Sequence, residues 1–269
     1  MINNNTTSLP PQIRVTLIGA GNVAYHLGYA ITKAAHMVLW QVYSRTTHSL
    51  QQWPFEAQQP ATDQIEGVDT NADLYIIAVS DDAISWVAQH LPALPRAIVV
   101  HTSGTAPLQH LARFEQHGIF YPLQTFSRSG AISIDKVPFI LSANTPAALA
   151  MLQDIVVQSL QAKYYILDEQ QRQYLHLAAV FANNFTNYMN IIANDILAQQ
   201  NLPFELLHPL INETAHKICR QPPLTAQTGP AKRNDQTTMA HHMQLLAQYP
   251  PQFAAVYSNL SEQISSRFN

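Results

Sequence analysis

The feature that most constrains the fold is a glycine-containing loop between a predicted strand and a predicted helix. Ile13–Ile18 is a β-branched apolar run that ends at Gly19, and apolar residues recur at helical spacing over residues 22–35. Gly19, Gly21 and Ala24 fit a Gly-x-Gly-x-x-Gly/Ala loop, which makes a tight turn, admits a pyrophosphate and lets the helix pack closely. The pattern predicts an anion site at the helix N-terminus, and the alternative is a turn that binds no ligand.

Apolar runs and amphipathic stretches alternate through the first half of the chain. Strands are predicted at 13–18, 38–43, 74–79, 97–101, 139–142 and 164–167, and helices at 22–35, 81–91 and 146–160. This alternation predicts an α/β fold with a doubly wound, Rossmann-type parallel sheet. The pattern then becomes helical over 169–200, and further helices are predicted after Pro203 and from Pro251. We therefore predict a Rossmann domain at 1–167 and an all-helical domain at 168–269.

Charge and composition exclude several classes of function. Lys and Arg number 14 against 17 Asp and Glu, and the net charge of −3 argues against nucleic acid or a membrane surface as partner. No His or Cys spacing typical of a metal site occurs, so no metal is expected. Residues 1–12 lack the basic start and apolar stretch of a signal peptide and are expected to be disordered. Cys219 is the single cysteine, which fits a reducing compartment, and a cytoplasmic location is expected.

The end of the second predicted strand bears on the choice of cofactor. The loop residues expected to contact a dinucleotide are Gly19, Ala20, Gly21, Asn22 and Val23. NAD-binding proteins place an acid at the end of the next strand, whereas Ser44, Arg45 and Thr46 supply a guanidinium and two hydroxyls that suit a 2′-phosphate. NADP(H) is therefore the expected cofactor, with NAD as the alternative. An ordinary surface role for Arg45 also stays open.

Two further strand ends carry polar side chains. Ligands of parallel α/β sheets bind beyond the carboxyl ends of the strands, where Val79, Ser80 and Asp81 follow one strand. His101 and Ser103 follow the next strand. Ser80 and Ser103 are candidates for binding the ribose or the nicotinamide amide, and His101 for facing the reacting carbon. Asp81 has an alternative role as a helix N-cap.

The predicted helical domain also holds polar candidates. His176, Asn183 and Asn184 interrupt an apolar helical pattern, and seven residues at 3.6 per turn place His176 and Asn183 on one face. That face either lines a cleft, where an imidazole handles a proton and the amides hold a substrate, or pairs with another helix or a second subunit. Arg233 either clamps a substrate carboxylate or lies in a solvated turn. Residues 121–124 are candidates for covering the nicotinamide face.

Six motifs together resemble a known family. They are GAGNVA at 19–24, AVSDDAI at 78–84, VHTSG at 100–104, FYPLQTF at 120–126, HLAAVFANNF at 176–185 and TGPAKRND at 228–235. The chain resembles the bacterial proteins in which a Rossmann-like domain precedes a helical domain of unknown function, which are often labelled NADP oxidoreductases. That family is similar to deazaflavin-dependent NADP reductases, pyrroline-5-carboxylate reductases and β-hydroxyacid dehydrogenases.

The resemblance implies a C-terminal domain like that of 6-phosphogluconate dehydrogenase, which often dimerises, so a homodimer is expected. β-Hydroxyacid dehydrogenases carry a Lys four residues before an Asn on the first helix of that domain. If Asn183 or Asn184 matches that Asn, the Lys position falls on Ala179 or Val180, and the ammonium group is missing. A plain hydroxyacid dehydrogenase mechanism is therefore not expected.

The function predicted from the sequence is hydride transfer between NADP(H) and a small carbonyl or imine compound in the cleft between the domains. His101 and His176 are the proton-handling candidates, and Asn183, Asn184 and Arg233 are the substrate-holding ones. Two other classes stay open. A deazaflavin-dependent NADP reductase needs no acid or base residue, and a dinucleotide-sensing protein needs no catalysis.

Overall fold

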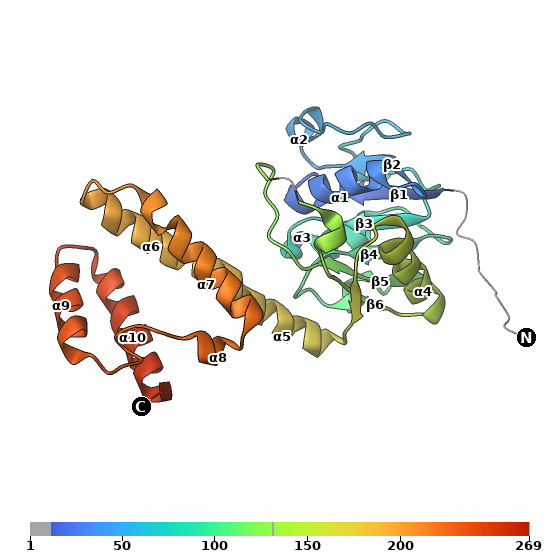
Figure 1. Ribbon diagram of the computed structural model, residues 1–269. Coiled ribbons are helices and arrows are strands. Elements are labelled where there is room, and N and C mark those ends of the chain that lie inside the picture. The colour runs from blue at the N-terminus through green and yellow to red at the C-terminus, as the bar shows by residue number, and fades with distance from the viewer. Residues whose placement is uncertain (1–11, 131, 269) are drawn as a thin grey trace, which may run out of the picture. The chain divides into compact units, whose positions relative to one another are not determined.

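The computed structural model describes residues 12–130 and 132–268 (Figure 1). Most of the stretch expected to be disordered, residues 1–11, lies outside the described residues. The chain forms two compact units, Met1–Val180 and Phe181–Asn269. Strands give way to helices at Asp168, the N-cap of α5 (Glu169–Ala179), which is where the sequence predicted the change. The first compact unit nevertheless continues through α5 to Val180.

A seven-stranded sheet forms the centre of the first unit. The strands lie in the order β2-β1-β3-β4-β5-β6-β7. Their bounds are β1 Ile13–Ile18, β2 Met37–Tyr43, β3 Leu74–Ile77, β4 Ile98–His101, β5 Gln116–Pro122, β6 Phe139–Ala143 and β7 Tyr164–Ile166. Every neighbouring pair is parallel except β5 and β6. The Rossmann-type α/β prediction is confirmed, but β5 was not among the predicted strands.

Helices cover both faces of this sheet. Residues of α1 (Asn22–Lys33) and α4 (Pro146–Asp154) belong to one hydrophobic cluster, and residues of α3 (Asp81–His90) belong to the other. Along β3, Leu74 and Ile76 join the first cluster while the residues between and after them join the second, because side chains alternate along a strand. Both faces of β3 are thus buried, as expected of a central parallel strand. The shorter elements are α2 Thr47–Gln51, the 3₁₀ turns Ile65–Gly67, Leu108–Leu111 and Ile134–Lys136, and a π-helical turn at Ile155–Ser159.

The second unit is helical, as predicted. It contains α6 Thr186–Gln199, a 3₁₀ turn at Phe204–Leu207, α7 His208–Arg220, α8 Pro223–Ala226, α9 Gln236–Leu246 and α10 Pro251–Phe268. Between α5 and α6 the chain stays helical but adopts wider π-helical turns at Val180–Phe185. The single helical stretch predicted over 169–200 is therefore confirmed, although its hydrogen-bond spacing changes in the middle. Within the described residues of this unit, the buried hydrophobic side chains are Ala231, Leu246 and Phe253.

Two absences hold for the described part of the chain. None of its helices combines the length and the apolar character that crossing a membrane requires. Its His, Cys, Asp and Glu side chains form no group of three or more that could hold a metal ion.

Candidate functional site

The two glycines of the loop between β1 and α1 have different structural roles. Gly19 has a φ of +120°, and a Cβ at this position would lie 2.3 Å from the carbonyl oxygen of Ala78. A residue with a side chain would therefore be strained there. Gly21 is the N-cap of α1, and a Cβ at Gly21 would meet no atom within 4 Å. The fold requires the first glycine, whereas the second leaves open space above the helix end.

The N-terminus of α1 can accept an anion in that space. No side chain caps this helix end, so the first N–H groups of α1, including those of Asn22 and Val23, are not satisfied by a cap. The helix dipole adds a partial positive charge at the same point. Ala24 is fully buried, which allows close packing of α1 on the sheet. The residues present therefore fit the pyrophosphate of a dinucleotide.

The loop after β5, which was not predicted to lie near this site, packs against it. Residues 123–130 follow β5, and the Asn22 side chain donates a hydrogen bond to the Phe126 carbonyl oxygen at 3.0 Å. The Nη2 atom of Arg128 donates to the Ala20 carbonyl oxygen at 2.6 Å. A guanidinium thus lies beside the glycine loop. The two residues are 108 positions apart, so no local pattern could have indicated this contact.

At the end of β2, one of the three predicted residues presents a free charge. Ser44 is buried, and its N–H donates to the Thr62 carbonyl oxygen at 3.1 Å. The Thr46 hydroxyl lies 2.7 Å from the Ser49 hydroxyl. Arg45 is exposed and has neither an ion pair nor a side-chain hydrogen bond to any residue that the structure describes. Arg45 is therefore the available cation at this strand end.

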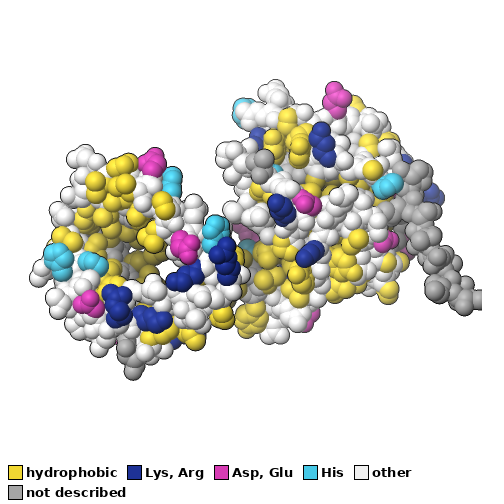
Figure 2. Space-filling view, viewed as in Figure 1, with side chains coloured by type: hydrophobic (Ala, Val, Ile, Leu, Met, Phe, Trp, Pro, Cys, Tyr) yellow, Lys and Arg dark blue, Asp and Glu magenta, His cyan; other side chains and the backbone are white. Residues whose placement is uncertain are grey.

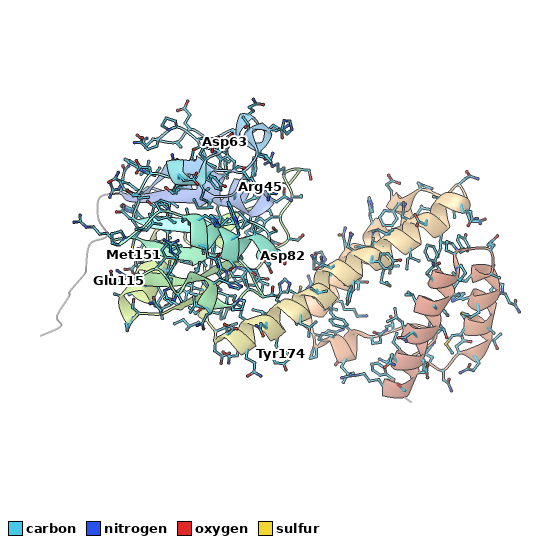
Figure 3. All side chains as sticks on the ribbon, turned by 180° about the vertical axis from the view of Figure 1, so that it is seen from behind. Arg45, Asp63, Asp82, Glu115, Met151 and Tyr174 are labelled. Atoms are coloured by element: carbon cyan, nitrogen blue, oxygen red, sulfur yellow. The ribbon has the colours of Figure 1, made fainter. Side chains whose placement is uncertain are left out.

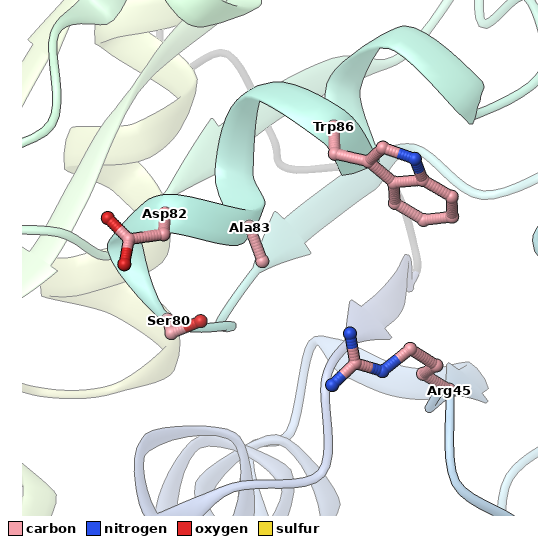
Figure 4. A pocket seen from close by; sticks show the side chains of 5 residues that line it. All are labelled: Arg45, Ser80, Asp82, Ala83 and Trp86. Atoms are coloured by element: carbon pink, nitrogen blue, oxygen red, sulfur yellow. The ribbon is translucent and has the colours of Figure 1, made fainter.

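Arg45 also lines a pocket of about 350 Å³. The pocket is lined by Arg45, Ser80, Asp82, Ala83 and Trp86 (Figure 4). Trp86 was not among the predicted site residues, and its indole stacks on the His90 ring with 4.2 Å between centroids. Figure 3 shows Arg45 and Asp82 toward one edge of the first unit and Glu115 toward the other. The pocket thus lies at the carboxyl edge of the parallel strands, where ligands of such sheets bind.

The three residues predicted to bind the cofactor after β3 have different surroundings. Ser80 is the N-cap of α3, yet its side chain makes no capping hydrogen bond and faces the pocket. Asp81, for which an N-cap role was the alternative, instead accepts a hydrogen bond from the Thr105 hydroxyl. Val79 is half-buried and packs against a core cluster. Of these three, Ser80 has the polar side chain that is free to meet a ligand.

His101 lies in the core, at the end of β4. Its exposed fraction is 0%, and its Nδ1 atom accepts a hydrogen bond from the Ser103 N–H at 3.2 Å. Burial, together with the nearby charge of Arg172, lowers the pKa of His101 to about 4. The ring is therefore neutral near pH 7, which argues against His101 as the group that exchanges a proton there. The Ser103 hydroxyl accepts from the N–H groups of Thr105 and Ala106 at 3.0 and 2.8 Å, so it shapes the loop.

A buried arginine supports the same loop. Arg172 on α5 is 1% exposed and donates to the carbonyl oxygens of Ser103 and Ala106 at 2.9 and 2.8 Å. Burial lowers the pKa of its guanidinium, and the carboxylate of Glu169 acts in the opposite direction. Arg172 was not among the predicted site residues, because an arginine in the first turns of a helix usually faces solvent.

His176, one turn further along α5, meets a tyrosine from β5. The Tyr121 hydroxyl lies 3.1 Å from the Nδ1 atom of His176, and both side chains are half-buried. Gly104 lies directly against this pair. His176 is thus the predicted proton-handling residue that the structure places next to the loop after β4.

The three residues predicted to hold the substrate belong to the second compact unit. Asn183 and Asn184 are exposed and lie in the π-helical stretch. Asn183 would share a face with His176 at 3.6 residues per turn, but the π-helical stretch between them departs from that spacing. Arg233 is exposed in the turn before α9, and Asp235 caps α9 by accepting the Thr238 N–H at 3.0 Å. The substrate-holding roles of Asn183, Asn184 and Arg233 stay predictions.

Several solved structures are similar to this chain. The chain is 35% identical to the "putative NADP oxidoreductase" from Bacteroides fragilis, with 95% of this chain and 99% of that one covered and a TM-score of 0.86. A protein from Thermotoga maritima is 20% identical over 94% of this chain and 97% of that one, with a TM-score of 0.68. A reductive aminase from Aspergillus terreus, in complex with NADPH and ethyl levulinate, is 14% identical over 95% of this chain and 94% of that one, with a TM-score of 0.70. The last two likenesses concern the fold alone.

Two sequence-family models together cover most of the chain. Residues 1–125 match a Rossmann-like domain, and residues 137–264 match a domain of unknown function, DUF2520. No curated protein matches the chain. Both domain matches and the similarity to the Bacteroides fragilis protein over nearly the whole length agree with the resemblance seen in the sequence. The chain therefore belongs to the family in which a Rossmann-like domain is followed by DUF2520.

Proposed function

We propose that this protein is an NADP(H)-dependent oxidoreductase that transfers hydride to or from a small carbonyl or imine compound. The observation that carries the proposal is the open, uncapped end of α1 at Gly21, together with the unpaired charge of Arg45 at the next strand end. The name of the Bacteroides fragilis relative supports an NADP-linked reaction. The Aspergillus terreus reductive aminase, which binds NADPH and ethyl levulinate, supports NADPH with a small organic compound.

Each part of the dinucleotide has residues suited to it. The N–H groups at the start of α1 and the guanidinium of Arg128 would hold the pyrophosphate. Arg45 would pair with the 2′-phosphate, because a guanidinium binds phosphate oxygens through paired, charge-assisted hydrogen bonds. Ser80 offers a hydroxyl at the pocket lined by Arg45. When bound, the nicotinamide supplies or accepts the hydride.

His176 is the chain's best-placed residue for moving the accompanying proton. It is half-buried beside Gly104 and hydrogen-bonded to Tyr121, whereas His101 is enclosed in the core. An imidazole can act as either a proton donor or a proton acceptor. Asn183, Asn184 and Arg233 complete the proposal as substrate-holding residues.

The cofactor part of the proposal is tested by thermal unfolding with NADPH, with NADH and with neither. A ligand that binds only the folded state stabilises it by about 2.7 kcal/mol at 100 times its Kd. We expect NADPH to raise the melting temperature more than NADH does. Gly21→Ala is the matched control, because its Cβ meets no protein atom and would obstruct only a ligand. Equal shifts would remove the preference for NADP(H), and no shift with either nucleotide would overturn the proposed function.

We also propose that the protein is a homodimer that pairs through its helical unit. This unit leaves large apolar side chains exposed, among them Phe181 at 62%, Leu206 at 61% and Leu210 at 63%. Figure 2 shows hydrophobic side chains on the visible surface of this unit. With three buried hydrophobic side chains in its described part, the unit has little core of its own, and a second copy would cover the exposed surface. Sedimentation should give a dimeric mass for the wild type and a monomeric mass for Leu210→Glu. Asn212→Glu, an exposed change on the same helix, is the control, and a monomeric wild type would refute the dimer.

A further inference from the structure

Tyr121 and His176 form a pair that neither residue's local sequence explains. Tyr121 lies at the carboxyl end of β5, and His176 lies on α5, 55 positions later. The hydroxyl oxygen and Nδ1 are 3.1 Å apart, within hydrogen-bond distance, and the ring centroids are 6.1 Å apart. Because both side chains are half-buried, the pair is held by the protein while remaining accessible.

Gly104 makes room for this pair. A Cβ at Gly104 would lie 2.5 Å from Nδ1 of His176 and 3.0 Å from Cζ of Tyr121. Any side chain at that position would therefore displace one ring or both. Gly104 follows β4, so the pair sits at the edge of the sheet where ligands of parallel α/β domains bind.

The surroundings favour a neutral phenol. Burial raises the pKa of Tyr121, while the guanidinium of Arg172 from α5 opposes this and the carboxylate of Asp81 from α3 adds to it. The net direction is upward, so Tyr121 keeps its proton through the neutral range. A group in this state can donate a proton and is unsuited to be the resting base.

We propose that Tyr121 is the catalytic acid of the reaction and that His176 is the relay that returns a proton to it. This inference rests on the proposed function. As hydride reaches the substrate carbon, the C=O or C=N π bond breaks and its electron pair takes the proton of the Tyr121 hydroxyl. The Tyr121 oxygen then takes the proton from Nδ1 of the protonated His176, which regains one from solvent. The sum is one hydride and one proton added to the substrate, and the reverse reaction follows the same steps backward.

The test compares two probes that differ in their need for a proton. Small ketones require both hydride and proton, whereas an N-methylated pyrrolinium salt is already cationic at nitrogen and requires hydride alone. Turnover of each with NADPH is measured for the wild type and Tyr121→Phe, which removes one hydroxyl. We expect ketone reduction to fall on the order of a hundredfold or more and pyrrolinium reduction to change less than about threefold. Tyr174→Phe, at an exposed tyrosine of α5, is the matched control and should change neither.

The role of His176 is tested through pH dependence. Ketone reduction is followed as a function of pH for the wild type and His176→Gln, and the substitution should change the shape of the ketone profile while retaining pyrrolinium reduction. Gly104→Ala, whose Cβ would displace one ring of the pair or both, should also lower ketone reduction. A pH profile unchanged in His176→Gln would remove His176 from the relay, because a merely structural role would lower turnover without altering the profile.

The outcomes separate this inference from the proposed function. If the wild type reduces both probes and Tyr121→Phe reduces both equally well, the proton donor is another group and the proposed function stands. If Tyr121→Phe loses both activities equally, Tyr121 acts on hydride transfer or on binding, and the acid role is refuted. If the wild type binds NADPH and reduces neither probe, the reductase function fails for these substrates and the relay fails with it.

Discussion

The two ends of the sheet's carboxyl edge are built in different ways. At the β1–β2 end, the anion site is made by main chain and small residues within one short stretch, where Gly19, Gly21 and Ala24 determine its shape. At the β4–β5 end, the site brings together three separate segments: the side chains of Tyr121 on β5 and His176 on α5, and the loop whose Gly104 leaves room for them.

This difference indicates how each end responds to change. A backbone site depends on dihedral angles and on the absence of Cβ atoms, so one added methyl group acts strongly. A side-chain site depends on buried polar groups that must be paired. Removing one partner leaves the other without its hydrogen bond and shifts the pKa values of nearby groups. Four predictions test the comparison.

The largest effect is expected at Gly19. Alanine there would combine a φ of +120° with a Cβ 2.3 Å from the Ala78 carbonyl oxygen. We expect the free energy of unfolding in urea to fall by about 3 kcal/mol or more. Gly21→Ala should cost less than about 1 kcal/mol and should weaken NADPH binding instead. If the two changes destabilise the protein equally, then it is wrong that the fold requires Gly19 and that Gly21 serves ligand binding.

Arg172→Met should have the next largest effect. The carbonyl oxygens of Ser103 and Ala106 would lose their buried donors. An unsatisfied buried acceptor costs about 1–3 kcal/mol, so we expect about 2–3 kcal/mol of lost stability in urea unfolding. Gln173→Met, at an exposed neighbour on α5, should change stability by less than about 0.5 kcal/mol. A stable Arg172→Met would show that the loop after β4 keeps its shape without the buried charge.

His101 should make stability depend on pH. Its folded-state pKa of about 4 lies below the ordinary value of 6.5, so between these values the unfolded state binds a proton that the folded state does not. Stability is therefore retained above about pH 6.5 and lost as the pH falls toward 4. From about pH 7 to about pH 4.5, the wild type should lose about 2 kcal/mol more than His101→Gln. Parallel curves for the two proteins would mean that His101 is accessible to protons in the folded state.

Arg45→Ala should have the smallest effect, and only on binding. Arg45 is exposed and unpaired within the described residues, so the free energy of unfolding should stay within about 0.5 kcal/mol. Affinity for NADPH, measured by calorimetry, should fall at least tenfold, or about 1.4 kcal/mol, with NADH affinity unchanged. An equal loss of NADH affinity would show that Arg45 binds a part that both nucleotides share, and not the 2′-phosphate.

The fold was largely predictable because each strand except β5 is a compact apolar run next to a helical pattern. Strand β5 was missed because it begins with Gln116 and His117, contains Gly118 and ends at Pro122, which together look like a loop. The structure satisfies these residues in particular ways. His117 is buried and its Nδ1 lies 2.8 Å from the Phe114 carbonyl oxygen, and Pro122 occupies the strand end, where a missing N–H does least harm.

The sequence by itself determined the glycine loop, the alternation that builds the sheet and the change to helices at Asp168, because these follow from dihedral preferences and from apolar spacing within short windows. Only the tertiary structure decided which polar groups are free and which are engaged. In the folded protein His101 and Arg172 are buried. Arg128 donates a hydrogen bond to the Ala20 carbonyl oxygen, and the Tyr121 hydroxyl lies within hydrogen-bond distance of His176. The physical reason is that burial and hydrogen bonding between distant segments depend on how the sheet stacks its loops, and no short window of residues encodes that arrangement.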